Sequence, residues 1–217
     1  MPIRVVLASA SPARLNLLRQ AGVEPTVIVS EVDEAAAEAD ARERYGDLEP
    51  ADIALVLARA KAEDVAEWAD AEDAFVIGCD SVLEFDGEAF GKPADAAEAI
   101  ARWQRMRGRT GVLHTGHWLI DTRETAADDP DAAGTGATLG ATASTTVHFG
   151  DLDDAEIEAY VATGEPLRCA GAFTIDGLGA PYIDGVDGDP SNVIGLSLPL
   201  LRSLLAELDI PFSALRP

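Results

Sequence analysis

The chain is poor in lysine and very rich in acid. Its two lysines, Lys61 and Lys92, stand against 39 acidic residues among 217, and the formal net charge is -23. A field of this sign repels nucleic-acid backbones and anionic membranes, which argues against a nucleic-acid-binding module or a membrane-surface protein. It also repels nucleotides, so any nucleotide site must be locally positive or contain a metal ion.

The acid excess has two interpretations. One is a well-solvated surface combined with a bias for arginine and alanine over lysine. The other is adaptation to high salt. Melting curves measured against KCl concentration would separate them.

Cysteine, aromatic residues and long apolar runs are also scarce. Cys79 and Cys169 cannot form a disulfide framework and lack metal-ligand spacing, so reduced thiols in a cytoplasmic protein are expected. Aromatic residues make up 6% of the chain, so alanine, leucine, valine and isoleucine must fill the core. No apolar stretch approaches the roughly 20 residues that span a bilayer, and the N-terminus leads straight into a strand-like run rather than a signal peptide. We expect one domain over residues 1–217.

Alternating hydrophobic patterns predict an α/β domain with a mixed sheet. Strands are expected at residues 3–8, 25–30, 74–79, 112–120 and 142–149, and helices from Ser11 to Gly22, from Pro50 to Trp68, from Asp95 to Gly108, from Asp153 to Gly164 and from Leu198 to Leu208. Asp86-Gly87 predicts a hairpin turn. The stretch 121–141 is rich in Ala, Gly, Thr and Asp, and is expected to be a flexible loop.

The segment LASASPAR, residues 7–14, is a candidate anion site. A strand that runs into a helix N-terminus directs backbone N–H groups and a positive dipole end at one point. Ser9 and Ser11 add hydroxyl donors, and Arg14 adds a guanidinium suited to phosphate oxygens. The alternative is that Ser11 only caps the helix and Arg14 lies at the surface.

Both lysines occupy unusual positions. Lys61 shares a helix face with Leu57 and Val65, so it either extends from the edge of the core to solvent or faces a cleft as a cation. Lys92 precedes Pro93, which restricts the lysine backbone to extended conformations. An ordinary solvated turn is the alternative for Lys92.

Asp80 follows the apolar run FVIGC, at the strand end where α/β folds place ligands. It could act as a general base toward water, hold Mg²⁺, or only cap the next turn. The acidic run around Glu34 could supply another metal ligand. The alternative is that it forms a solvated loop. The histidines His114, His117 and His148 show no metal spacing, and His114 and His117 are expected on opposite faces of a strand.

Several motifs in order resemble those of the Maf family of nucleoside triphosphate pyrophosphatases. LASASPAR resembles the family's LASxSPRR, RAKA (59–62) its REKA, and GCDS (78–81) its GADT, while GKP (91–93) is identical. GEP (164–166), CAGAF (169–173) and DGDPSNVIGL from Asp187 resemble the C-terminal block. The resemblance extends from residue 5 to about 205 and leaves only the 121–141 stretch outside it, as a loop insertion.

This resemblance implies an elongated α/β fold of the Maf and inosine-triphosphatase type, with two lobes around a central cleft, often in a homodimer. It implies hydrolysis of nucleoside triphosphates, including modified or non-standard ones, to the monophosphate and pyrophosphate with a divalent cation, Mg²⁺ or Mn²⁺. Asp80 would activate water and hold the metal with the help of Glu34. The residues expected to bind the substrate are Ser9, Ser11, Arg14, Lys61 and Lys92. The alternative is a non-catalytic nucleotide-binding regulator of cell division.

Three positions depart from the family pattern. Ala13 replaces the first arginine of SPRR, Ser81 the threonine of GADT, and Asp176 the glutamine of GIQG. These positions are associated with base choice in the branch that cleaves dTTP and UTP. CAGAF and DPSN are closer to the branch acting on 7-methyl-GTP, but the tryptophan of that branch is also absent at Ala13. The preferred base stays open.

Overall fold

The computed structural model describes residues 2–125 and 134–217. Its described part is an α/β structure whose seven-stranded mixed sheet runs in the order β2-β1-β3-β5-β6-β7, with β4 also paired to β3. The strands are β1 (Val5–Leu7), β2 (Thr26–Val27), β3 (Phe75–Phe85), β4 (Glu88–Phe90), β5 (Thr110–Asp121), β6 (Thr138–Phe149) and β7 (Ile183–Asp187). Strand β1 is parallel to β2 and β3, and the other pairs are antiparallel. The predicted mixed sheet is confirmed.

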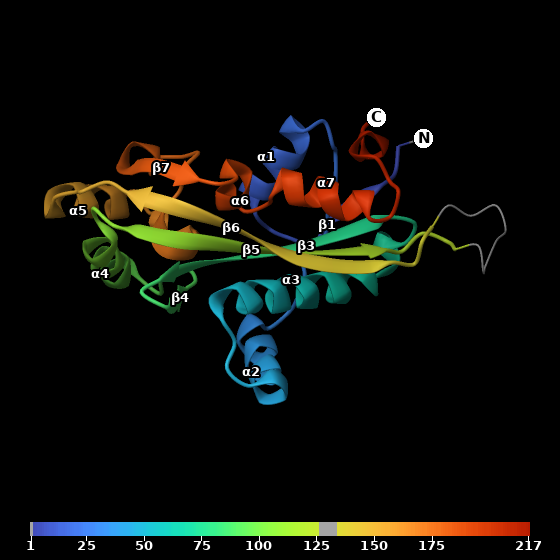
Figure 1. Ribbon diagram of the computed structural model, residues 1–217, viewed down its shortest axis with the longest axis horizontal. Helices are drawn as coiled ribbons and strands as arrows, with labels where there is room; N and C mark the ends of the chain where they lie inside the picture. The colour runs from blue at the N-terminus through green and yellow to red at the C-terminus, as the bar shows by residue number, and fades with distance from the viewer. Residues whose placement is uncertain (1, 126–133) are drawn as a thin grey trace.

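Helices cover both faces of the sheet (Figure 1). They are α1 (Pro12–Gln20), α2 (Glu34–Tyr45), α3 (Pro50–Ala66), α4 (Ala96–Met106), α5 (Asp154–Ala162), α6 (Pro190–Ile194) and α7 (Leu198–Ala206). Helix α3 lies against one face, while α1, α6 and α7 lie against the other. Helix α2 extends away from the body beneath α3.

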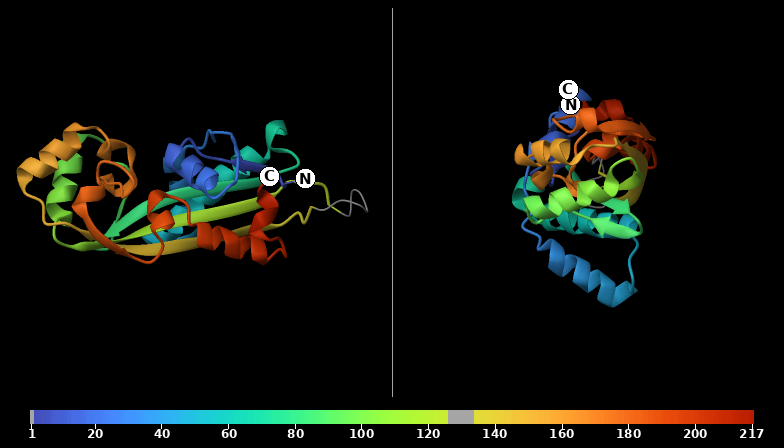
Figure 2. Two further views of the ribbon diagram at one scale, coloured as in Figure 1. Left: turned by 90° about the horizontal axis from the view of Figure 1, so that it is seen from above. Right: turned by 90° about the vertical axis from the view of Figure 1, so that its left-hand side faces the viewer.

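The molecule is elongated, with α4 and α5 gathered at one end (Figure 2). The core of that end is aromatic, with Trp103, Phe149 and Tyr160 in edge-to-face contacts. At the other end leucines of α1 and α7 pack on Phe75 and Ile77 of β3. The long strands β3, β5 and β6 connect these two lobes, in agreement with the expected architecture.

Small residues let α3 approach the sheet very closely. Ala54, Ala58 and Ala62 are fully buried along one side of the helix. A Cβ atom added to Gly78 of β3 would lie 2.2 Å from the carbonyl oxygen of Ala58, so only glycine fits there. The approach brings Lys61, which directly precedes Ala62, to Asp80 near the middle of β3.

Local sequence signals account for many element boundaries. Asp153 and Glu156 form the reciprocal capping box that the sequence predicts for α5. Asp86 and Gly87 both have positive φ and join β3 to β4 as a two-residue hairpin, as predicted. Asp95 caps α4 by accepting from the N–H of Glu98.

Several predicted boundaries are wrong. Strand β3 does not stop at Cys79 but continues to Phe85, so Asp80 lies inside a strand rather than after one. Strand β6 begins at Thr138 rather than at 142, because its first residues pair with the end of β5. The predicted 121–141 loop is therefore shorter, and its residues 126–133 lie outside the described residues. Helix α2 was not expected at all.

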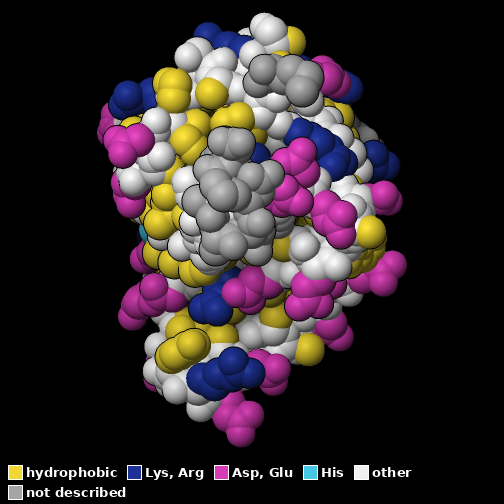
Figure 3. All heavy atoms as spheres, turned by 90° about the vertical axis from the view of Figure 1, so that its right-hand side faces the viewer, with side chains coloured by type: hydrophobic (Ala, Val, Ile, Leu, Met, Phe, Trp, Pro, Cys, Tyr) yellow, Lys and Arg dark blue, Asp and Glu magenta, His cyan; other side chains and the backbone are white. Residues whose placement is uncertain are grey.

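The acidic residues are spread widely over the surface. Figure 3 shows Asp and Glu side chains across the face it views, with Lys and Arg side chains between them. No helix in the described ranges is both long and apolar enough to cross a membrane.

Candidate active site

A break in strand pairing creates the site. Along one edge of β3, pairing with β1 ends at Ile77 and pairing with β4 begins at Leu83. Asp80 and Ser81 lie in the interval between, where none of the described strands covers this edge. Both residues line the space between the two lobes.

That space is a cavity of about 1290 Å³. It is lined by every residue that the sequence predicted for the site: Ser9, Ser11, Ala13, Arg14, Glu34, Lys61, Asp80, Ser81, Lys92 and Asp176. These residues come from α1, α2, α3, β3 and the loops around β4 and Ala170–Ala172. The fold brings them together, although their separate roles stay predictions.

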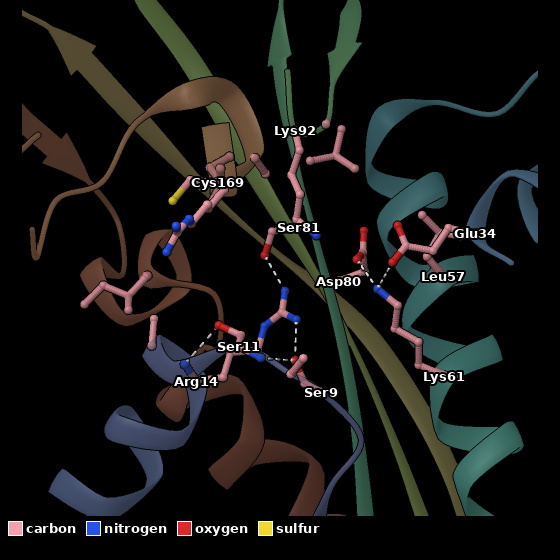
Figure 4. Close-up of a pocket in the computed structure, with 18 of the residues that line it drawn as sticks. Ser9, Ser11, Arg14, Glu34, Leu57, Lys61, Asp80, Ser81, Lys92 and Cys169 are labelled. Atoms are coloured by element: carbon pink, nitrogen blue, oxygen red, sulfur yellow. Dashed lines mark hydrogen bonds and ion pairs between the residues drawn. The ribbon is translucent and has the colours of Figure 1, made fainter. Parts of the chain in front are cut away.

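Lys61 lies between two carboxylates (Figure 4). Its Nζ is 2.6 Å from Oδ1 of Asp80 and 2.8 Å from Oε1 of Glu34. The side chains of Lys61 and Asp80 are only 11% and 13% exposed, whereas that of Glu34 is 48% exposed. The lysine therefore faces the cavity rather than extending to bulk solvent.

Three cations of the cavity, Lys61, Lys92 and Arg14, lie close enough to Glu34 to affect its pKa. Burial alone would raise the pKa of the Glu34 carboxyl. The hydrogen bond and charge of Lys61, together with the charges of Lys92 and Arg14, outweigh burial and hold the pKa below its ordinary value. The scarce cations thus act on one point in an otherwise acidic protein.

Arg14 is the second buried cation of the cavity. Its Nε donates to the carbonyl of Gly195 at 2.7 Å, and its Nη1 donates to Oγ of Ser9 at 3.0 Å. Ser11 caps α1 by accepting from the backbone N–H of Arg14. The interpretation of Ser11 as a cap is confirmed, but Arg14 is buried and not a surface residue.

Lys92 follows β4 and points into the cavity from the opposite side to Arg14 (Figure 4). Cys169 also lines the cavity, and burial raises the pKa of its thiol to about 11. The thiol form of Cys169 therefore predominates at neutral pH, which makes it a poor nucleophile.

Some cavity residues were missed at the sequence level. Glu38 and Arg42 of α2 line the cavity and form an i,i+4 ion pair. The cap at Asp33 and the glycine at Gly46 could have indicated this helix, but its one buried residue is Ala41, so no apolar stripe marks it. Arg168 also lines the cavity without a local signal.

His114 and His117 lie on opposite faces of β5, as expected, and His148 lies on β6. His114 makes hydrogen bonds with Ser144 and Glu84, while His117 accepts from the backbone N–H of Ser197. Within residues 2–125 and 134–217, no group of three or more His, Cys, Asp or Glu side chains is arranged to hold a metal ion.

The family described as Maf-like protein matches residues 4–208. The chain is 54% identical to the nucleoside triphosphate pyrophosphatase of Salinispora tropica, over 99% of this chain and 88% of the relative. It is 58% identical to the protein of the same name from Streptomyces coelicolor, over 94% of this chain and 90% of the relative. A protein named nucleoside triphosphate pyrophosphatase from Nostoc punctiforme is 49% identical over 94% of the chain. The chain belongs to the Maf family.

Proposed function

We propose that the protein is a nucleoside triphosphate pyrophosphatase that converts (d)NTPs, including modified or surplus ones, to the monophosphate and pyrophosphate. The observation that carries the proposal is the Lys61–Asp80 pair in a cavity that also contains Arg14. The name shared by relatives at 49–58% identity supports it.

Asp80 is the proposed general base. Lys61 engages its Oδ1, and no hydrogen bond within the described ranges engages its Oδ2. The free oxygen can take a proton from a water molecule that attacks the α-phosphorus. The hydrogen bond from Lys61 fixes the carboxylate in one orientation, which favours an in-line attack.

Arg14, Lys61 and Lys92 are the proposed phosphate-binding cations. Charge grows on the phosphate oxygens as the pyrophosphate leaves, and positive side chains stabilise that charge, most strongly the buried Arg14 and Lys61. Ser9, Ser11 and the N-terminus of α1 add donors beside Arg14. The three substituted positions, Ala13, Ser81 and Asp176, line the same cavity and leave the preferred base open.

A divalent cation, Mg²⁺ or Mn²⁺, fits the donor set. Asp80 and Glu34 each have one carboxylate oxygen on the ammonium of Lys61, so the two carboxylates lie close together and their other oxygens would hold the ion. Mg²⁺ is usually held by one or two carboxylates together with substrate phosphates and water, so these two residues would suffice to hold it. When bound, the ion would neutralise charge on the phosphate oxygens.

The test is a panel of nucleotides, including dTTP, UTP, CTP and 7-methyl-GTP, incubated with the protein and Mg²⁺ or Mn²⁺. The proposal predicts monophosphate plus pyrophosphate. Release of orthophosphate would contradict it. Asp80→Asn should abolish turnover and leave nucleotide binding largely intact, whereas a non-catalytic regulator would show no turnover in either form.

The proposal places the enzyme in the cytoplasm as a homodimer. Light scattering after size-exclusion chromatography measures the mass of the assembly. A monomer would contradict the proposed homodimer.

A further inference from the structure

The guanidinium of Arg14 is held on three sides by groups from distant parts of the chain, and Figure 4 labels two of them, Ser9 and Ser81. Gly195 accepts from Nε, Ser9 accepts from Nη1, and Ser81 accepts from Nη2 at 3.1 Å. A guanidinium has five donors in one plane, so three acceptors fix both its position and its orientation.

The proton positions in this network can be deduced. Thr115, which is fully buried, donates its hydroxyl hydrogen to the carbonyl of Asn192 at 2.9 Å. A hydroxyl has a single hydrogen, so in the 2.9 Å contact between Ser81 and Thr115 the donor must be Ser81. The chain of donation runs in one direction: Arg14 to Ser81, Ser81 to Thr115, and Thr115 to Asn192.

The far end of this chain is rigidly held. Asn192 is fully buried on α6, and its Nδ2 donates to the carbonyl of Leu113 and to Oγ1 of Thr145. These two partners belong to β5 and β6. The acceptor for Thr115 is therefore fixed to the central strands of the sheet.

Ser9 and Ser81 consequently play different parts. The oxygen of Ser9 accepts from Arg14 and from the backbone N–H of Ser11, and no acceptor in the described ranges takes its hydrogen. Ser9 is free to donate to a phosphate oxygen. The hydroxyl hydrogen of Ser81 is donated to Thr115, so toward Arg14 Ser81 acts only as a hydrogen-bond acceptor.

We propose that Thr115 is a positioning residue, which orients Ser81 as an acceptor and thereby aims Arg14 at the phosphates. This inference rests on the proposed function for the identity of the ligand. Its structural part, that Thr115 restricts the motion of Arg14, does not depend on any activity. Ser81 then acts by holding Arg14 rather than by donating a hydrogen bond to the base.

The experiment compares Thr115→Val, which keeps the shape and removes the hydroxyl, with Thr115→Ser, which retains the hydroxyl. Thr142→Val is the matched control, because the hydroxyl of Thr142, on the neighbouring strand β6, donates to the carbonyl of Ala51 and makes no hydrogen bond with Ser81 or α6. Ser81→Ala, at the cavity wall, removes the same link should Thr115→Val fail to fold.

The first readout is guanidinium rotation in Arg14, measured by ¹⁵N NMR with the signal assigned by its loss in Arg14→Lys. We expect slow rotation in the native protein, Thr115→Ser and Thr142→Val, and faster rotation in Thr115→Val and Ser81→Ala. Unchanged rotation in both of the latter variants would overturn the inference. Equal acceleration in Thr142→Val would also overturn it, because the loss of a hydroxyl outside the chain would then have the same effect.

The second readout is kinetic. One net hydrogen bond contributes about 1 kcal/mol, so kcat/KM should fall about fivefold in Thr115→Val, mainly through KM, and recover in Thr115→Ser. Faster rotation with unchanged kcat/KM would refute the link to the reaction. A native protein without pyrophosphatase activity would refute the proposed function alone, because the rotation measurement would still decide the role of Thr115.

Discussion

Replacing Lys61 with methionine tests the electrostatic centre of the cavity. The change removes the ammonium that lies 2.6 Å from Asp80 and 2.8 Å from Glu34. Breaking a buried ion pair by removing one partner costs about 3–5 kcal/mol, because the remaining charge is left without compensation. Asp80 is still 13% exposed at the cavity wall, so we expect a loss nearer ~2–3 kcal/mol in the free energy of unfolding.

A double-mutant cycle separates this penalty from lost packing. Once Asp80→Asn is present, Lys61→Met no longer strands a carboxylate at position 80. The combined loss should therefore be smaller than the sum of the single losses by at least about 1 kcal/mol. Urea denaturation at neutral pH measures all four free energies. Additivity within about 0.5 kcal/mol would refute the reasoning.

Arg59→Met on the same helix is the control for this cycle. Arg59 pairs with Glu63, and both side chains are about half exposed. An exposed pair contributes little, so the expected loss is under about 1 kcal/mol. A loss as large as that of Lys61→Met would show that the helix, not the buried charge, is sensitive to the change.

Two further predictions concern packing and pH. Gly78→Ala should lower the free energy of unfolding, measured by urea denaturation, by about 3 kcal/mol or more, because the new Cβ would lie 2.2 Å from the Ala58 carbonyl oxygen. Gly185→Ala is the control: no atom lies within 4 Å of its added Cβ, so the loss should be under about 0.5 kcal/mol. Equal losses would contradict the close approach of α3. Burial lowers the pKa of His117 to about 4, so the unfolded chain binds the proton first as pH falls below about 6.5. His117 should therefore lower the free energy of unfolding by roughly 3 kcal/mol between pH 6.5 and 4. In His117→Gln the free energy of unfolding should fall by that much less over the same range. The same pH dependence in both proteins would contradict the burial of His117 as a neutral group.

Local signals predicted the parts of the fold that depend on local chemistry. The capping box at Asp153 and the turn at Asp86-Gly87 need only neighbouring residues, and both are confirmed. Helix α2 was missed because its apolar face is almost empty, so hydrophobic periodicity could not reveal it. Its helical propensity and its cap at Asp33 were the available signals.

In the site, too, some residues could be predicted from local sequence and others could not. The scarcity of lysine, together with the resemblance of short motifs, singled out Lys61, Asp80 and Arg14, and the fold brings them to one cavity. The position of Asp80 was predicted wrongly because an acidic residue is unfavourable inside a strand, and only the unpaired edge of β3 and the contact with Lys61 accommodate it. The motif DGDPSNVIGL contains Asn192, but its link through Thr115 to Arg14 could not be predicted, because a buried hydrogen-bond chain between distant segments has no local pattern.

The central claim is that Asp80 directs water onto the α-phosphorus of a bound nucleoside triphosphate. The most direct measurement is a single turnover in ¹⁸O-labelled water, followed by mass spectrometry of both products. The account predicts the label in the nucleoside monophosphate and none in pyrophosphate, with turnover lost in Asp80→Asn. Label in pyrophosphate, or undiminished turnover in Asp80→Asn, would contradict it.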